Sequence, residues 1–165
     1  MGRRYILTGE NMTLGTGSIL AAIQAAAAGS PGSWLEIERV EVSQNHNNSA
    51  AQVRIFQGKR NTAGTLTVTS ATPSPLVLGG PASGISGGTS PLSAATCGVN
   101  SSADSGGAYI FGPYVNPNNL GGYIFQPIPD HKIIVPPGVV YAVGFVAAPV
   151  DLAGWTVSVW FHEVM

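Results

Sequence analysis

The sequence predicts an all-β protein, an antiparallel β-sandwich, and three observations support that prediction. Short runs of residues alternate between apolar and polar, which is the pattern of strands that cover a core with one face. Turn-forming Gly, Pro and Asn residues recur between these runs. Two long neighbouring runs near the C-terminus, at 139–147 and 155–163, have the length of central strands. The rest of the chain should pack around them.

The C-terminal third gives the clearest strand pattern. Pro137-Gly138 suits the middle of a type II turn, because proline fixes φ and glycine supplies a positive φ. Val139–Ala147 is apolar on both alternating faces, so we expect a strand that is covered on both sides. Trp155–Glu163 alternates. Val157, Val159 and Phe161 should point to the core, and Thr156, Ser158, Trp160 and His162 should point away from it.

The N-terminal part is less regular. Arg4–Gly9 fits a short first strand. Ser18–Ala28 is rich in alanine, which favours a helix, but Ile19 and Ile23 also fit a period of two. An isolated helix of about ten residues is marginal without packing, so we favour an extended segment. Ser30–Ser33 should be a turn.

A phase slip marks the next strand, Trp34–Ser43. Leu35 and Ile37 have one parity, whereas Val40 and Val42 have the other. A β-bulge near Glu38-Arg39 would shift the alternation by one residue and bring all four side chains to the same face.

The remaining chain predicts short strands around one long loop region. Residues 58–107 are dense in Gly, Ser, Thr and Pro, and we expect a long inserted loop there that lies across another surface. The expected strands are Gln52–Gln57, Leu66–Thr69, Leu76–Leu78, Tyr109–Tyr114, Tyr123–Gln126 and Lys132–Val135, with a turn at Asn116–Asn119. The chain should thus be a single domain over 1–165 with about eight strands, an N-terminal arm over 1–18 and the loop region over 58–107.

The scarcity of charge is the most informative feature of the composition. Only 9% of the residues are charged and the net charge is −1, against roughly 25% charged residues in typical soluble domains. Free monomers usually carry mixed surface charge to stay dispersed, so we expect a permanent subunit of an oligomer or assembly. The alternative is a monomer coated with Gly, Ser, Thr and Asn. The near-neutral charge gives no basic footprint for nucleic acid, and no apolar run reaches the ~18 residues of a membrane span.

The single Cys97 cannot form an internal disulfide, which fits synthesis in a reducing compartment. The N-terminus lacks the basic, apolar and cleavage regions of a signal peptide. We therefore expect synthesis in a reducing cytoplasm, with Cys97 as a small loop residue.

Candidate catalytic patterns are present but weak. Gly84-Ile85-Ser86-Gly87-Gly88 matches G-x-S-x-G, but its flanks are loop-like, whereas a nucleophile elbow needs a strand before it and a helix after it. An esterase acting through Ser86 is thus the weakest of the functions considered. Glu36, Glu38 and Glu41 form the only acidic cluster and could serve glycoside hydrolysis. A sheet surface or an ion pair between subunits is the simpler interpretation, with Arg39 and Arg54 as possible partners of Glu36 and Glu38.

No set of residues predicts a metal or cofactor site. His46, His131 and His162 are not spaced as ligands, and no base, nucleophile and oxyanion site come together. The sequence therefore predicts a protein that is not an enzyme, with no catalytic, cofactor-binding or metal-ligating residues. Aromatic residues gather in two regions, and we expect most in the core and a minority at an interface. They are Tyr109, Phe111, Tyr114, Tyr123 and Phe125, then Trp155, Trp160 and Phe161.

Three stretches together resemble small virion proteins of tailed bacteriophages. They are SWLEIERVEVSQN…AQVRIFQ, the Gly/Pro-rich segment after it, and YIFQPIPDHKIIVPPGVVYAVGFVAAP…WTVSVWFHE. The resemblance covers most of the chain and rests on strand rhythm and the IIVPPG ending. It implies a jelly-roll-like sandwich, and a capsid decoration or cement protein that binds the major capsid protein on the head surface, often as a homotrimer. It transfers no functional residue.

Two other classes stay open. A receptor- or carbohydrate-binding module of a phage tail or fibre would line a groove with its aromatic residues. A jelly-roll coat protein would assemble into closed shells by itself.

Overall fold

A computed structural model describes residues 3–15, 18–45, 53–62, 64–92, 95–105, 110–111 and 122–164. The regular secondary structure of the described part consists of β-strands and one short 3-10 helix, η1 (Pro129–His131). Its strands form a six-stranded and a seven-stranded sheet. They are β1 (Arg3–Met12), β2 (Ile19–Gln24), β3 (Trp34–Gln44), β4 (Ile55–Arg60), β5 (Thr65–Ser70), β6 (Ser74–Pro75), β7 (Ser86–Gly87), β8 (Thr96–Ser105), β9 (Ile110–Phe111), β10 (Tyr123–Phe125), β11 (Ile133–Val135), β12 (Val140–Phe145) and β13 (Trp155–Val164).

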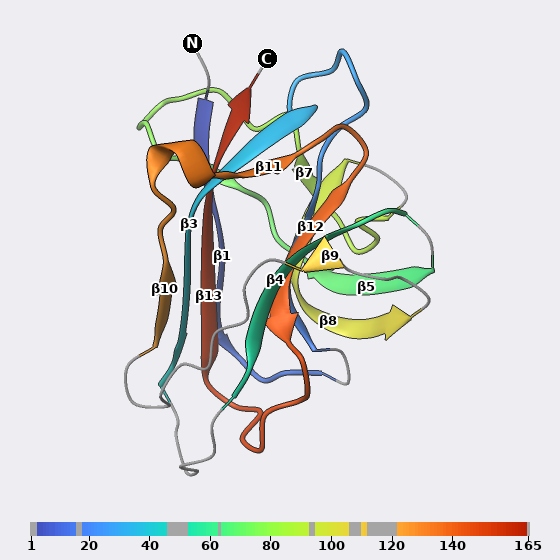
Figure 1. Ribbon diagram of the computed structural model, residues 1–165, viewed down its shortest axis with the longest axis vertical. Helices are drawn as coiled ribbons and strands as arrows, with labels where there is room; N and C mark the ends of the chain where they lie inside the picture. The colour runs from blue at the N-terminus through green and yellow to red at the C-terminus, as the bar shows by residue number, and fades with distance from the viewer. Residues whose placement is uncertain are drawn as a thin grey trace.

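Strands from the N-terminal part of the chain pair in order with strands from its C-terminal part, so that four antiparallel pairings are nested one inside the other (Figure 1). The first strand, β1, pairs with the last, β13, and β2 pairs with β12. Further inward, β3 pairs with β10 and β11, and β4 pairs with β9. A long hairpin rolled up in this way, with alternate pairs in alternate sheets, is a jelly roll. The predicted antiparallel sandwich with jelly-roll-like connectivity is therefore the observed fold.

The predicted β-bulge lies in β3. Arg39 pairs with Trp160 of β13, and Ile37 pairs with Phe161, so Glu38 is the additional residue. The bulge keeps Leu35, Ile37, Val40 and Val42 buried on one face although their parity changes.

Ser18–Ala28 is extended where it forms a strand, as expected. Every side chain of β2 and of its partner β12 is buried, so both strands are covered on both faces. Burial of small side chains on two sides, rather than helix propensity, decides the conformation of this alanine-rich stretch. The turn before β12 is also confirmed, because Val139 N donates to Pro136 O at 3.1 Å and Gly138 has φ +72°.

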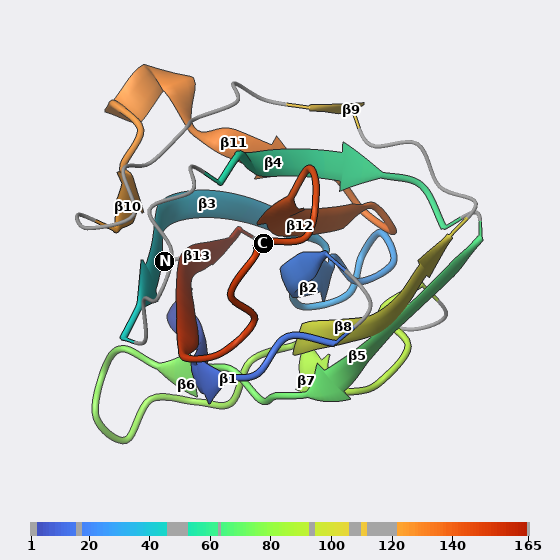
Figure 2. The ribbon, with the colours of Figure 1, turned by 90° about the horizontal axis from the view of Figure 1, so that it is seen from below.

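The expectation of one long loop over 58–107 is wrong for much of its length. Residues 58–60 end β4, and β5 and β8 pair with each other along most of their length. This insertion between β4 and β9 extends both sheets, because β8 pairs with β2 and β6 pairs with β1. Figure 2 shows β2 and β12 between β13 on one side and the paired strands β5 and β8 on the other. The paired strands β5 and β8 therefore bury the face of β2 and β12 that points away from β13.

Some boundaries also differ from the prediction. β1 is an inner strand of the six-stranded sheet, so residues 3–12 are not an arm. Strand β4 begins at Ile55 rather than at Gln52, which lies outside the described residues. Leu76–Leu78 is not a strand, since β6 ends at Pro75. Of the predicted strand at Tyr109–Tyr114 only Ile110–Phe111 is described, and the turn at Asn116–Asn119 lies outside the described residues.

Two apolar cores result from this arrangement. The larger one fills the space between the sheets and contains the inward side chains of β13, namely Trp155, Val157, Val159 and Phe161. The smaller one lies on the outer face of β2, β12 and β4 and includes Phe56, Leu66 and Val68.

A fully buried arginine, Arg60 at the end of β4, pairs with Asp104 at the end of β8 at 2.6 Å. This ion pair links the two outer parts of the curled seven-stranded sheet.

Candidate functional site

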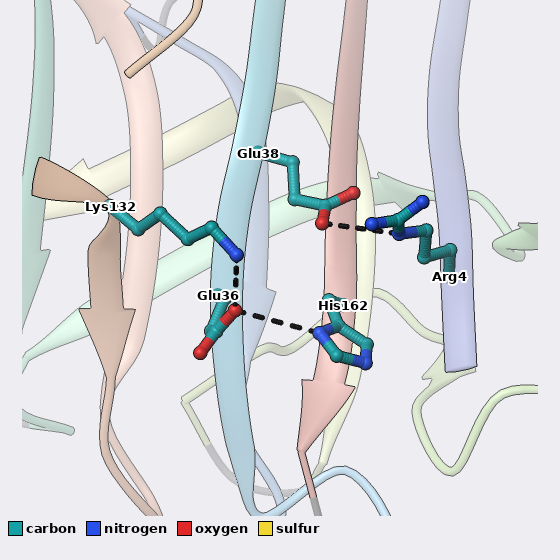
Figure 3. A network of polar contacts seen from close by, with 5 residues as sticks. All are labelled: Arg4, Glu36, Glu38, Lys132 and His162. Atoms are coloured by element: carbon teal, nitrogen blue, oxygen red, sulfur yellow. Dashed lines mark hydrogen bonds and ion pairs between the residues drawn. The ribbon is translucent and has the colours of Figure 1, made fainter. Parts of the chain in front are cut away.

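Several of the few charged residues of the chain lie together on the outer face of the six-stranded sheet (Figure 3). Lys132 Nζ donates to Glu36 Oε2 at 2.8 Å, and His162 Nδ1 lies 3.5 Å from the same oxygen. Arg4 Nε lies 3.2 Å from Glu38 Oε1. These side chains come from β1, β3 and β13 and from the segment before β11, so four parts of the chain meet on this face.

The two glutamates are not arranged as a catalytic pair. A hydrogen bond from Lys132, aided by the charges of Lys132 and His162, lowers the pKa of Glu36 against a smaller opposing effect of desolvation. A general acid in glycoside hydrolysis needs a raised pKa instead. Glu38 has its own cation, Arg4. The geometry therefore agrees with the sheet-surface interpretation of the acidic cluster, with its ion pairs formed within the chain.

Glu36 and Glu38 pair with other cations than predicted, whereas the predicted Arg39 does pair with the third glutamate of the cluster, Glu41. Arg39 forms an ion pair with Glu41 and lies 5.2 Å from the centre of the Trp160 ring. Arg54 lies just before β4, which belongs to the other sheet. The error arises because the cations of Glu36 and Glu38 come from β1 and from the segment before β11, both distant along the chain.

Ser86 does not lie in a nucleophile elbow. It begins β7, which pairs in parallel with β8, and its side chain is exposed. No helix follows it within the described residues up to Leu92. The strand–turn–helix context of a G-x-S-x-G nucleophile is therefore missing at this position.

A buried carboxylate that the prediction omitted lies close to this motif. Glu163 is the last inward residue of β13, and it accepts hydrogen bonds from Ser83 Oγ and from Gly84 N, the latter at 3.0 Å. Continued alternation beyond Phe161 would have placed Glu163 inside. The contact anchors the start of the motif segment to the C-terminal strand.

The two described histidines and the cysteine lie on different elements. His131 is exposed in η1, His162 shares the outer face with Trp160 as predicted, and His46 lies outside the described residues. Cys97 is not a loop residue but a buried residue of β8, and desolvation raises the pKa of its thiol to about 12. Among the described residues, no group of three or more potential ligands could hold a metal ion.

Some of the aromatic residues in the two predicted regions lie in the described part of the chain. Tyr123, Trp155 and Phe161 are buried, as expected for most aromatic residues. Tyr123 also ends a buried chain of hydrogen bonds. Tyr141 Oη donates to Gln57 Oε1, and Gln57 Nε2 donates to Tyr123 Oη at 2.8 Å. This chain connects the two sheets. The placements of Tyr109 and Tyr114 lie outside the described residues.

Among the residues that the structure describes, three consecutive exposed apolar side chains lie in a turn that the sequence predicted as a strand. Leu76, Val77 and Leu78 follow one another, and Leu78 is fully exposed. Other large apolar side chains are exposed singly or in pairs, among them Trp34, Ile124, Ile128 and Val150. Three consecutive exposed apolar residues are unusual in a monomeric domain and point to an interaction surface.

No helix among the described residues has the length and apolar character needed to cross a membrane. Comparisons with protein-family models, with curated proteins and with solved structures found no match to this chain.

Proposed function

We propose that this chain is a structural protein of a virion, a decoration or cement protein that binds the major capsid protein on the head of a tailed bacteriophage. In this proposal it acts without catalysis, as a homo-oligomer such as a trimer. The observation that supports it most is the combination of very low charge, 9% of residues, with exposed apolar side chains. Such a surface is better suited to permanent contacts than to a dispersed monomer.

The architecture is compatible with this role. Jelly rolls occur in viral capsid proteins and in lectins, although a fold by itself does not select a function. The charged residues on the outer face of the six-stranded sheet are largely paired within the chain. Their pairing reduces the charge that a neighbouring subunit would have to desolvate alone.

A cement protein stabilises a shell by binding only the assembled state, so its effect follows mass action. The test uses phage particles from the source culture. We expect mass spectrometry to find the chain in many copies per head, and heads without it to release their genome at a lower temperature. Adding purified chain should restore the heat resistance. Particles that lack the chain, or heads whose stability does not respond to it, would contradict the proposal.

The contact surface must be tested with point substitutions. Deleting Gly79–Ser105 would remove β8, which lies inside the seven-stranded sheet, and would therefore disrupt the fold. A glycan array with the purified chain tests the receptor-binding alternative. Glycan binding without head binding would replace the proposal by that alternative.

A further inference from the structure

Glu163 carries a buried carboxylate whose partners are neutral groups. The residue is 2% exposed, and no ion pair among the described residues includes it. Ser83 Oγ donates to its Oε1, and Gly84 N donates to both oxygens at 3.0 and 3.3 Å. Burying a carboxylate costs far more than burying a neutral amide. A glutamine could accept the same hydrogen bonds, so anchoring the loop does not explain why a charged group lies here.

Ser83 has the contacts of an activated nucleophile. Its hydroxyl donates to Glu163 and accepts a hydrogen bond from Ile85 N at 3.0 Å. A hydroxyl oxygen has two lone pairs, so one remains for attack while the carboxylate is in place to take the proton. A hydroxyl held against a base in this way is the first requirement of nucleophilic catalysis.

Packing also holds this nucleophile in place. A Cβ atom on Gly84 would lie 2.4 Å from Pro31 O, so the backbone after Ser83 is pressed against the turn at 30–33. Only glycine allows this approach. The position of the Ser83 hydroxyl beside Glu163 is therefore fixed by packing as well as by hydrogen bonds.

The carbonyl group that precedes Ser83 has its own hydrogen-bond donor. Tyr5 Oη donates to Ala82 O at 3.1 Å and to Pro81 O at 3.2 Å. Burial raises the pKa of Tyr5, and the charge of Glu163 raises it further, so the phenol stays protonated and can donate. A fixed donor at a carbonyl oxygen stabilises the negative charge that develops there during attack. Ala82 is exposed, so water can reach this peptide bond.

We propose that these groups cleave the chain itself between Ala82 and Ser83, through an ester on the Ser83 side chain. Ser83 Oγ attacks the carbonyl carbon of Ala82, and its proton passes to Glu163. The electron pair of the C=O bond moves to the oxygen that Tyr5 contacts. The C–N bond then breaks, and Glu163 returns the proton to the Ser83 nitrogen. Water hydrolyses the ester, leaving a carboxylate on Ala82 and a hydroxyl and a free amine on Ser83.

The fold predicts that the two products stay together. Strands β1 and β2 precede the cleaved bond, and their partners β13 and β12 follow it. The cleaved chain should therefore keep its native mass and separate only on denaturation. The reaction occurs once on its own chain and gives no turnover. It is independent of the virion role, because it concerns the purified chain alone.

Incubation of the purified full chain tests the proposal. We expect denaturing electrophoresis and mass spectrometry to find fragments 1–82 and 83–165, while sedimentation velocity shows an unchanged native mass. Ser83→Ala should abolish the cleavage. Glu163→Gln should slow it at least about 100-fold, as loss of a general base does, and Tyr5→Phe should slow it about 100-fold, as loss of an oxyanion donor does.

The matched control is Ser86→Ala, which changes an exposed serine of the same segment. It should leave the rate of cleavage unchanged. Circular dichroism and thermal melting should show that the variants are folded. Cleavage that persists in Ser83→Ala would identify a contaminating protease and overturn the proposal, as would equal rates in wild type and folded Glu163→Gln.

A Ser83→Cys variant gives a second measurement that changes no buried residue. Its thiol would form a thioester with Ala82, and added dithiothreitol would cleave that thioester faster than water does. We expect dithiothreitol to release fragment 1–82 from Ser83→Cys and to leave Ser83→Ala intact. The proposal would be wrong if both wild type and dithiothreitol-treated Ser83→Cys stayed uncleaved.

Discussion

At the scale of residues, Arg60 and Asp104 form a buried ion pair. The Arg60 side chain is completely buried, and the Asp104 side chain is 17% exposed. Breaking a buried pair leaves an uncompensated charge, which costs far more than the pair contributes by itself. We expect Asp104→Asn to lower the free energy of unfolding by about 3 kcal/mol in urea titrations.

The control for this prediction is Glu41→Gln. It removes the partly exposed ion pair with Arg39, and we expect a loss below about 1 kcal/mol. The double variant Arg60→Met/Asp104→Leu should recover much of the stability, because it leaves no charge buried. Equal effects of Asp104→Asn and Glu41→Gln would show that Arg60 is solvated in the folded protein.

Glu36 gives a prediction on pH. Its pKa is lowered in the folded state from an ordinary value of 4.5, first by the Lys132 hydrogen bond. The carboxylate therefore stabilises the fold fully above pH 4.5, and this contribution is lost as the pH falls through the folded-state pKa. We expect the melting temperature of Glu36→Gln to depend less on pH below 4.5 than that of wild type. An equal pH dependence of the melting temperature in Glu36→Gln and in wild type would contradict this prediction.

At the scale of elements, the bulge in β3 aligns both halves of the strand with the core. Without Glu38, Leu35 and Ile37 would shift by one residue and turn to the outer face. We expect deletion of Glu38 to abolish cooperative thermal unfolding. Glu38→Ala keeps the bulge and removes only the ion pair with Arg4, so it should cost less than about 1 kcal/mol. A deletion variant that melts like wild type would show that the register can slip freely.

The sequence was sufficient for elements whose burial is regular along the strand. The alternation of Val157, Val159 and Phe161 predicted β13, and the phase slip predicted the bulge, because both follow directly from which face is buried. It was insufficient for β8, where Gly98 and Ser101 interrupt the apolar pattern and pairing with β2 and β5 supplies the order. Long-range pairing of this kind has no local signal.

The candidate surfaces were predictable only in part, for the same reason. The acidic cluster of β3 was visible, but its cations, Arg4 and Lys132, lie far away along the chain. The inward direction of Glu163 could have been inferred from alternation, but not its contact with Ser83. Leu76–Leu78 has the composition of a strand, and only the absence of neighbours around it reveals the exposed turn.

For the whole molecule, the hydrogen-bond chain from Tyr141 through Gln57 to Tyr123 couples the two sheets. Tyr141→Phe would leave Gln57 Oε1 buried without this donor, which should cost about 1–3 kcal/mol in the free energy of unfolding. The double variant Tyr141→Phe/Gln57→Leu tests the cause, because it removes both polar groups. A Tyr141→Phe protein as stable as wild type would mean that another group reaches this oxygen.

Because Cys97 is buried, its chemical labelling can be used to measure local opening of the fold. A thiol with a pKa of about 12 is almost entirely protonated at pH 8, so a thiol reagent should label it only after β8 separates from β2 and exposes it. The rate of labelling then measures how often the paired strands β5 and β8 separate from β2. We expect this rate to rise in Asp104→Asn more steeply than in Glu41→Gln. The same reaction could be followed within any larger assembly. Slower labelling there would show that neighbouring molecules keep strands β5 and β8 in place.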